Sequence, residues 1–377
     1  MSTETPSIIT THKTSRALPT SLLQNLIKPF GNKLVQPGDA LPAGSPVLTP
    51  DSSVYKYCNV EHRVVEGIHV YDISAKSSSK QHDGDAKHEG DVKHNGDDEY
   101  MGVGEMNGAG RGEAGKRKQI YYFCGGGWQS PPSKEHWKLC TQLAQAGTKR
   151  GISTTVSVIS YPLAPNSPAS ITLPLLEKLY YTVLSPQPTD NTTETNDIEI
   201  TLAGDSSGAN IALSLTLSIL NKDEHAPAPH ALLLLSPPVD LRNTNPEMQA
   251  IEPHDPVLTI PFVQSTARAW CTGVRSDTPD SHPAPSIAYD DPCVSPLFAD
   301  VAVLRARGVL VHGVVGGYDV LTPDALLFRE KLVKEGVKGR WLEWERQMHC
   351  FILAGAGYGL PEGKEAVEWV EGVLFDG

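Results

Sequence analysis

The chain has 377 residues, of which 39% are hydrophobic and 20% are charged, a composition typical of a globular protein and not of a wholly disordered one. Its 32 Lys and Arg residues against 44 Asp and Glu residues give a formal net charge of −12, so its field repels phosphate backbones and anionic lipid surfaces. Composition and charge therefore argue against nucleic acid as a partner, and the length allows one large α/β domain or about 2.5 average domains.

The N-terminal residues predict a cytoplasmic protein. Residues 1–23 lack the basic segment and uninterrupted apolar stretch of a secretory signal. The aliphatic run from Ala231 to Leu235 is far shorter than the ~20 residues that span a membrane. The six Cys residues are scattered without a Cys-x-x-Cys pair, which favours reduced thiols over disulfides or a zinc site. We therefore expect no stable membrane insertion and no metal centre.

Residues 1–50 are predicted to form an N-terminal segment with a cap helix. Residues 22–30 carry apolar side chains at helical spacing, namely Leu22, Leu23, Leu26, Ile27 and Phe30. Residues 60–73 then alternate in polarity around Glu66 and Gly67, which predicts an antiparallel pair of strands.

Residues 76–116 have almost no aliphatic side chains and cannot form a core, so they are predicted to be a disordered insertion. His82, His88 and His94 recur in it with a six-residue period beside Asp residues, and weak binding of a divalent metal is the alternative interpretation. If the insertion is only solvated filler, its deletion should leave activity nearly intact.

From residue 119 onward, short apolar runs alternate with helical patterns, which predicts an α/β fold with a largely parallel sheet covered on both faces. The expected strands are residues 119–123, 154–160, 198–203, 231–235 and 308–315. A Pro-rich stretch at 241–290, containing Trp270, is expected to form a cap insertion in a hydrolase domain spanning 51–377. Such a cap would cover the carboxyl edge of the sheet, where open α/β folds bind ligands.

The sharpest local signal is the run Gly204-Asp205-Ser206-Ser207-Gly208, a G-x-S-x-G motif between an apolar strand and a helical pattern. In that context the serine occupies a strained turn at a helix N-terminus, and the glycines remove side chains that would clash with the strand and helix. The motif predicts that Ser206 is a nucleophile.

A nucleophilic serine needs a histidine base and an orienting acid, in the chain order Ser, acid, His. Asp319 follows the strand at 308–315, and His349 follows the strand-like residues 341–347. They are the predicted acid and base. The alternative acids are Asp324, Glu343 and Glu345, and the alternative histidines are His312, expected inside a strand, and His136, expected on a helix.

Three consecutive glycines, Gly125 to Gly127, follow the strand at 119–123 and precede Trp128. Backbone N–H groups in such a turn can point at a substrate oxygen. The N–H groups of Gly126, Gly127 and Ser207 are therefore the predicted oxyanion hole.

Over residues 119–375 the chain resembles the hormone-sensitive-lipase-like branch of the α/β-hydrolases, the GDXG lipolytic family. The resemblance implies an eight-stranded, mostly parallel sheet with a cap, and hydrolysis of carboxylic esters without a cofactor. It rests on five segments in the family's order: Cys124-Gly125-Gly126-Gly127, Tyr161-Pro162-Leu163-Ala164-Pro165, Gly204 to Gly208, Gly317 to Leu321, and His349-Cys350-Phe351.

One position departs from that family. Cys124 stands where the family has the histidine of its His-Gly-Gly-Gly segment, and a thiol is a weak donor. The glycine donors are retained, so we expect activity to persist. A catalytic Cys124 is a minor alternative, because the sequence places no basic residue beside it to lower the thiol pKa.

These features predict a serine carboxylesterase that acts on small to medium esters, and Trp128 and Trp270 suggest apolar or aromatic groups in the substrate. A role in tailoring a secondary metabolite is an analogy only. The alternatives are an amide, formamide or lactone hydrolase, since the Gly-Gly-Gly-Trp segment resembles that of arylformamidases, and a non-catalytic binding protein resembling the gibberellin receptors. The presence of His349 weighs against the last.

Overall fold

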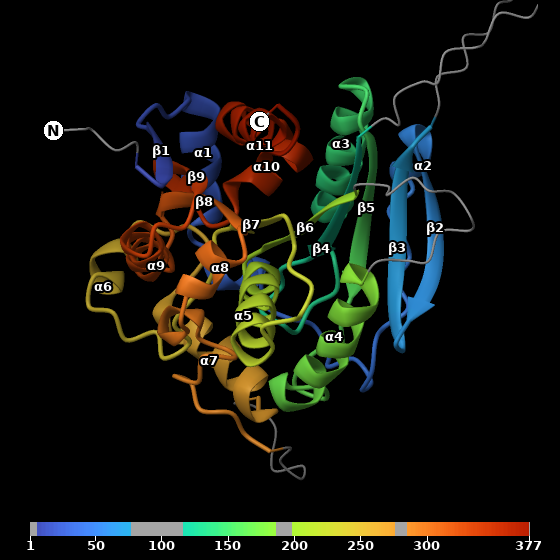
Figure 1. The fold of residues 1–377 in the computed structure, drawn as a ribbon. Coiled ribbons are helices and arrows are strands. Elements are labelled where there is room, and N and C mark those ends of the chain that lie inside the picture. The colour runs from blue at the N-terminus through green and yellow to red at the C-terminus, as the bar shows by residue number, and fades with distance from the viewer. Residues whose placement is uncertain (1–5, 77–115, 186–197, 276–284, 377) are drawn as a thin grey trace, which may run out of the picture.

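In the described part of the chain, a nine-stranded sheet crosses the molecule (Figure 1). The computed structural model describes residues 6–76, 116–185, 198–275 and 285–376. The strands lie in the order β1-β9-β8-β7-β6-β4-β5-β3-β2, and all neighbours are parallel except β3 with β5 and β2 with β3. Their bounds are Ile8–Lys13, Cys58–Val65, Ile68–Ala75, Arg117–Phe123, Ser153–Ser160, Ile198–Asp205, Ala231–Leu235, Leu310–Tyr318 and Gly339–Met348 for β1 to β9.

The sheet confirms the predicted α/β class, with one more strand than the expected eight. The additional strand is β1, whose sequence is mostly polar and which, among the described strands, pairs only with β9 at the sheet edge. An edge strand of that kind lacks the continuous apolar run by which the central strands were found. The predicted hairpin is also confirmed, because β2 and β3 pair in full register around a turn at Glu66 and Gly67.

Helices cover both faces of the sheet (Figure 1). One face packs on α3 (Lys134–Lys149), α10 (Phe351–Tyr358) and α11 (Pro361–Phe375). The opposite face packs on α4 (Ala169–Leu184), α5 (Ser207–Lys222), α8 (Ala302–Ala306) and α9 (Thr322–Lys334). The central strand β7 is buried along its whole length, because it has apolar layers above and below.

The N-terminal helix α1 (Leu18–Ile27) differs from the sequence expectation. It ends before Phe30, and the side chains of Leu22, Leu26 and Phe30 are more than half exposed. Its buried residues are instead Thr20 and Gln24. Thr20 donates a hydrogen bond to the buried Glu362 of α11, and Gln24 donates one to the carbonyl of Arg346. Polar contacts therefore decide which face of α1 meets the protein.

The range predicted as a cap, 241–290, contains α6 (Met248–Ile251) and α7 (Ile260–Thr272). The short elements η1 (Gly31–Leu34), α2 (Val54–Tyr57) and η2 (Pro296–Phe298) complete the described part. The predicted insertion spans 76–116, and its residues 77–115, with the three histidines, lie outside the described residues. No helix within the described ranges is long and apolar enough to cross a membrane.

Candidate active site

Ser206 occupies the turn between β6 and α5, with backbone angles φ 49° and ψ −127°. Few non-glycine residues adopt this conformation, and its cost is tolerated where the surrounding structure holds it. The Ser206 N–H donates to the carbonyl of Leu235 on the neighbouring strand at 2.8 Å. The strained turn predicted from the motif is therefore present, with its serine at the N-terminus of α5.

The two glycines of the motif allow a close approach between β4 and this turn. A Cβ atom at Gly204 would lie 2.6 Å from the carbonyl oxygen of Phe123, and one at Gly208 would lie 1.9 Å from the same oxygen. Both distances are well inside van der Waals contact. Glycine at these positions lets α5 start directly against β4 and sets Ser206 beside the glycine turn.

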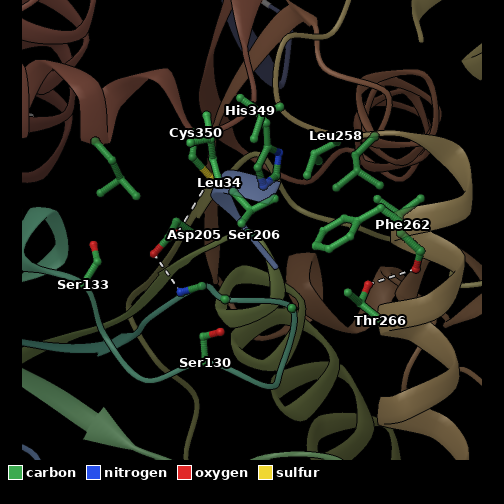
Figure 2. A pocket seen from close by; sticks show the side chains of 18 of the residues that line it. Leu34, Ser130, Ser133, Asp205, Ser206, Leu258, Phe262, Thr266, His349 and Cys350 are labelled. Atoms are coloured by element: carbon green, nitrogen blue, oxygen red, sulfur yellow. Dashed lines mark hydrogen bonds between the residues drawn. The ribbon is translucent and has the colours of Figure 1, made fainter. Parts of the chain in front are cut away.

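His349 and Asp319 meet at the carboxyl edge of the sheet, after β9 and β8 respectively. His349 Nδ1 lies 2.8 Å from Asp319 Oδ2, and Asp319 is fully buried. Asp319 Oδ1 also accepts a hydrogen bond from the Leu321 N–H at 3.0 Å, which fixes the carboxylate. A neutral His349 that donates from Nδ1 keeps Nε2 as its basic nitrogen. In Figure 2 the His349 ring points toward Ser206.

The environment of His349 favours its charged form. Burial opposes protonation, but the Asp319 carboxylate and the neighbouring Cys350 raise the pKa of His349 well above its ordinary value. An imidazole that gains a proton readily is suited to accept one from a serine hydroxyl during attack.

The glycine turn after β4 lies against the same edge. Gly126 and Gly127 both have positive φ angles, of 137° and 59°. Within the described ranges, their N–H groups donate to no other residue, whereas the Gly126 carbonyl accepts from the N–H groups of Gln129 and Ser130. Ser207 begins α5, and the first N–H groups of a helix have no intrahelical partner. These three N–H groups are the oxyanion donors predicted from the sequence.

Asp205, immediately before Ser206, connects the glycine turn to the nucleophile turn. Its Oδ1 accepts from the Gly125 N–H at 3.1 Å and from the Tyr122 hydroxyl at 2.9 Å, and its Oδ2 lies 3.1 Å from His136 Nε2. Burial would raise the pKa of Asp205, but His136 and these hydrogen bonds lower it. The carboxylate therefore stays ionised in a buried site.

His136 is on α3, as predicted, and acts on Asp205 and not on Ser206. The N–H of Ser133 donates to its Nδ1 at 3.0 Å, so Nδ1 carries the lone pair and Nε2 carries the proton shared with Asp205. The glycine turn is thus anchored from α3, even though Cys124 replaces the family histidine. Cys124 itself is buried, and burial raises the pKa of its thiol well above the ordinary value.

The other candidates from the sequence lie elsewhere. His312 is inside β8, where its Nδ1 accepts from the Arg340 N–H, and burial lowers its pKa to about 4. Glu343 forms an ion pair with Arg329 on the neighbouring helix. Asp324 accepts from the Asn245 side chain at 2.7 Å, and Glu345 is on β9. None of these four residues lines the pocket that holds Ser206 and His349.

That pocket has a volume of about 390 Å³ and a mostly apolar lining (Figure 2). Ser206, His349 and the three glycines line it. Its walls come from the N-terminal segment, the predicted cap and the segments after β8 and β9, and include Leu34, Val35, Leu258, Phe262, Val263, Leu321, Met348 and Leu353. Trp128 lines it as well and stacks on the buried Trp270 of α7 at 5.7 Å between ring centroids. No cluster of metal-binding side chains occurs among the described residues.

Two residues of the site, Asp205 and Asp255, were not predicted from the sequence to have a role. Asp205 was visible within the motif but was given no role, because a hydrogen bond to Gly125, 80 residues earlier, cannot be read from spacing. Asp255 lies in the Pro-rich stretch and contacts the turn that follows Asp319. Its only sequence signal is an Asp-Pro pair, which ordinarily indicates a turn.

A family model described as the alpha/beta hydrolase fold matches residues 120–353. This chain belongs to the α/β-hydrolase fold family. Within this α/β-hydrolase, the match runs from β4 through His349 and so contains every predicted site residue.

Relatives of this α/β-hydrolase include an esterase of Acinetobacter venetianus, 29% identical over 259 residues, which cover 68% of this chain and 74% of the relative. An acetyl-hydrolase of Streptomyces hygroscopicus is 26% identical over 169 residues, which cover 45% of this chain and 50% of the relative. The match to the first relative spans most of both chains. The match to the second covers about half of each.

Solved structures of similar fold include an esterase from the bacterial hormone-sensitive lipase family, with a TM-score of 0.63 and 18% identity over 96% of this chain and 99% of that one. An esterase/lipase from an uncultured bacterium gives a TM-score of 0.62 and 20% identity over 94% of this chain and 97% of that one. The predicted resemblance to the hormone-sensitive-lipase-like branch is confirmed at the level of the fold.

Proposed function

We propose that the protein is a serine carboxylesterase in which Ser206 is the nucleophile, His349 the base and Asp319 the orienting acid. The observation that carries the proposal is the 2.8 Å contact between His349 Nδ1 and Asp319 Oδ2, because His349 lines the same pocket as the strained Ser206 turn. The names of the two relatives, an esterase and an acetyl-hydrolase, support ester hydrolysis as the reaction.

In the proposed mechanism, Ser206 Oγ attacks the ester carbonyl carbon while its proton passes to His349 Nε2. Asp319 stabilises the resulting imidazolium, and the N–H groups of Gly126, Gly127 and Ser207 stabilise the oxyanion. The alcohol leaves with the proton from His349. Water then gives a proton to His349 and attacks the acyl-enzyme, which releases the carboxylic acid and regenerates Ser206.

The pocket lining favours small to medium apolar or aromatic esters. Leu258, Phe262 and Val263 approach from the predicted cap, and Leu34 and Val35 from the N-terminal segment. A volume of about 390 Å³ accommodates a small ligand with its apolar groups out of water. No cofactor takes part in the proposed reaction.

The test is hydrolysis of short and medium-chain p-nitrophenyl esters by the wild type and by Ser206→Ala, together with labelling by a serine-directed fluorophosphonate. We expect turnover and labelling in the wild type and the loss of both in the variant. Full turnover by Ser206→Ala would refute the assignment of the nucleophile.

A matched panel of anilide, formanilide and lactone substrates tests the alternative that the same residues cleave another bond. A wild type that cleaves one of these faster than every ester would overturn the ester assignment but keep the serine mechanism. Absence of both turnover and labelling would instead support the non-catalytic binding protein.

A further inference from the structure

A second buried carboxylate, Asp255, lies beside the proposed triad acid. It sits between α6 and α7, with 5% of its surface exposed. Its Oδ1 accepts from the N–H groups of Val257 and Leu258 at 2.8 and 2.9 Å, and its Oδ2 accepts from the Val320 N–H at 3.0 Å. One side chain thus holds three backbone N–H groups from two separate segments.

Both of these segments belong to the site. Val257 and Leu258 line the pocket, while Val320 follows Asp319 directly. In the turn after β8, the Val320 N–H donates to Asp255 and the next N–H, of Leu321, donates to Asp319 itself. The turn that carries Asp319 is therefore held by two carboxylates, its own and that of Asp255.

We propose that Asp255 is a positioning residue that ties the pocket wall at Val257 and Leu258 to the turn carrying Asp319, and thereby orients His349. This inference rests on the proposed esterase mechanism. Without the Asp255 carboxylate, the Val320 N–H would be buried and unpaired, and the turn would be free to rotate Asp319 away from His349. Small displacements of a catalytic group cost rate even when the protein stays folded.

The surroundings of Asp255 disfavour its ionised form. A residue that only held the backbone in place would not need a charge in such a position. Burial and the neighbouring Asp319 raise the pKa of Asp255 to about 7. No Lys, Arg or His side chain in the described ranges forms an ion pair with it. When ionised, it places a second negative charge beside Asp319, the carboxylate that contacts His349.

The other charged and titratable groups around Asp255 have their own partners. Glu252 accepts from the Ile260 N–H, His254 stacks on Tyr318 at 5.1 Å, and Lys28 donates to the Pro253 carbonyl. Arg16 lies 5.5 Å from the centre of the Tyr318 ring. Asp319, with His349 beyond it, is therefore the group whose charge Asp255 influences most directly.

The experiment compares Asp255→Asn with Asp324→Asn in the full chain. Asparagine keeps the size of the side chain, and its oxygen can still accept from Val257 and Leu258, but its amide nitrogen cannot accept from Val320. Asp324→Asn is the matched control, because Asp324 is also a buried carboxyl with a raised pKa but hydrogen-bonds Asn245 and does not line the pocket. Thermal melting verifies that both variants are folded.

For Asp255→Asn we expect kcat to fall about 10- to 100-fold with KM changed less than about threefold, because the loss is one of orientation and not of binding. The acid limb of the kcat/KM–pH profile should move to lower pH, since a negative charge near His349 is removed. The rate of fluorophosphonate labelling of Ser206 should fall in parallel. Asp324→Asn should leave all three measurements unchanged.

A folded Asp255→Asn variant with wild-type kcat, or with a lowered kcat but an unmoved acid limb, would overturn the positioning role while the esterase assignment stands. A wild type that neither turns over esters nor accepts the fluorophosphonate would refute the esterase assignment, and the positioning role would fall with it.

Discussion

Asp205 Oδ1 accepts a hydrogen bond from the Gly125 N–H at 3.1 Å, so the residue before the proposed nucleophile also holds the start of the glycine turn. Its other oxygen contacts His136 on α3. The proposed nucleophile and the proposed oxyanion donors are thus fixed to each other through one buried carboxylate. A substitution of His136 on α3 should therefore affect both turns of the proposed active site.

His136→Leu should lower the free energy of unfolding by about 2 kcal/mol, because it removes a hydrogen bond to a buried charge. The pKa of Asp205 is lowered in the protein, so Asp205 stabilises the fold above its unfolded-state pKa and that contribution is lost as pH falls. Without His136 the loss should begin at a higher pH. Urea unfolding of the wild type and variant between about pH 2 and pH 8 measures this, with the exposed His225→Leu as control. Equal acid sensitivity of the wild type and His136→Leu would contradict the prediction.

Gly126→Ala should lower kcat by about 100-fold, because the added methyl group displaces the glycine turn and turns the Gly126 N–H away from the oxyanion position. An added Cβ would lie 2.8 Å from the Ser130 carbonyl oxygen, and the φ of 137° disfavours alanine as well. Gly44→Ala is the matched control, since Gly44 also has a positive φ of 98° but has open space around it. The measurement is kcat of Gly126→Ala and of Gly44→Ala with one p-nitrophenyl ester. Equal kcat values for the two variants would show that only general strain is involved.

Cys124→Ala should keep kcat within about threefold of the wild type, because a buried thiol with a raised pKa stays protonated and unreactive. The contact that Cys124 makes with Tyr161 is through its backbone carbonyl, at 2.7 Å, and survives the substitution. Iodoacetamide should likewise leave Cys124 unmodified in the native protein, as mass spectrometry can show. Loss of turnover in a folded variant would revive the catalytic-thiol alternative.

Phe262→Ala should widen the pocket and shift the preference toward longer or bulkier esters by about tenfold in relative kcat/KM, the scale at which apolar pockets discriminate. Phe262 lines the pocket from α7. Phe298→Ala serves as control, because Phe298 lies outside the lining and is partly exposed. The measurement is kcat/KM over a series of p-nitrophenyl esters from acetate to decanoate. An unchanged profile would mean that the substrate occupies another part of the pocket.

Most of the architecture was accessible from the sequence, because each central strand is a short apolar run followed by a helical pattern. The run at 231–235 matches β7 residue for residue, and the turn at Glu66 and Gly67 was placed correctly. The edge strand β1 and the exposed face of α1 were not, since both depend on tertiary partners. Thr20 and Gln24 are buried only because Glu362 and Arg346 offer them hydrogen bonds from distant parts of the chain.

In the site, too, the residues in local motifs were predictable from the sequence, and those that act through tertiary contacts were not. Local motifs indicated Ser206 and the glycine turn, since their chemistry requires particular residues at adjacent positions. The contact between Asp319 and His349 was an expectation from strand ends, and the structure supplies its distance. Asp205 and Asp255 act through contacts between separate segments, so no pattern within one segment could assign them a role.

The position of the insertion has a practical consequence. β3 ends at Ala75 and β4 begins at Arg117, while the glycine turn follows the opposite end of β4, at Phe123. The chain between these strands therefore joins the sheet at the edge away from Ser206. We therefore expect a fluorescent reporter or affinity tag placed between residues 76 and 116 to leave ester hydrolysis intact, because both attachment points lie at the end of β3 and β4 away from Ser206.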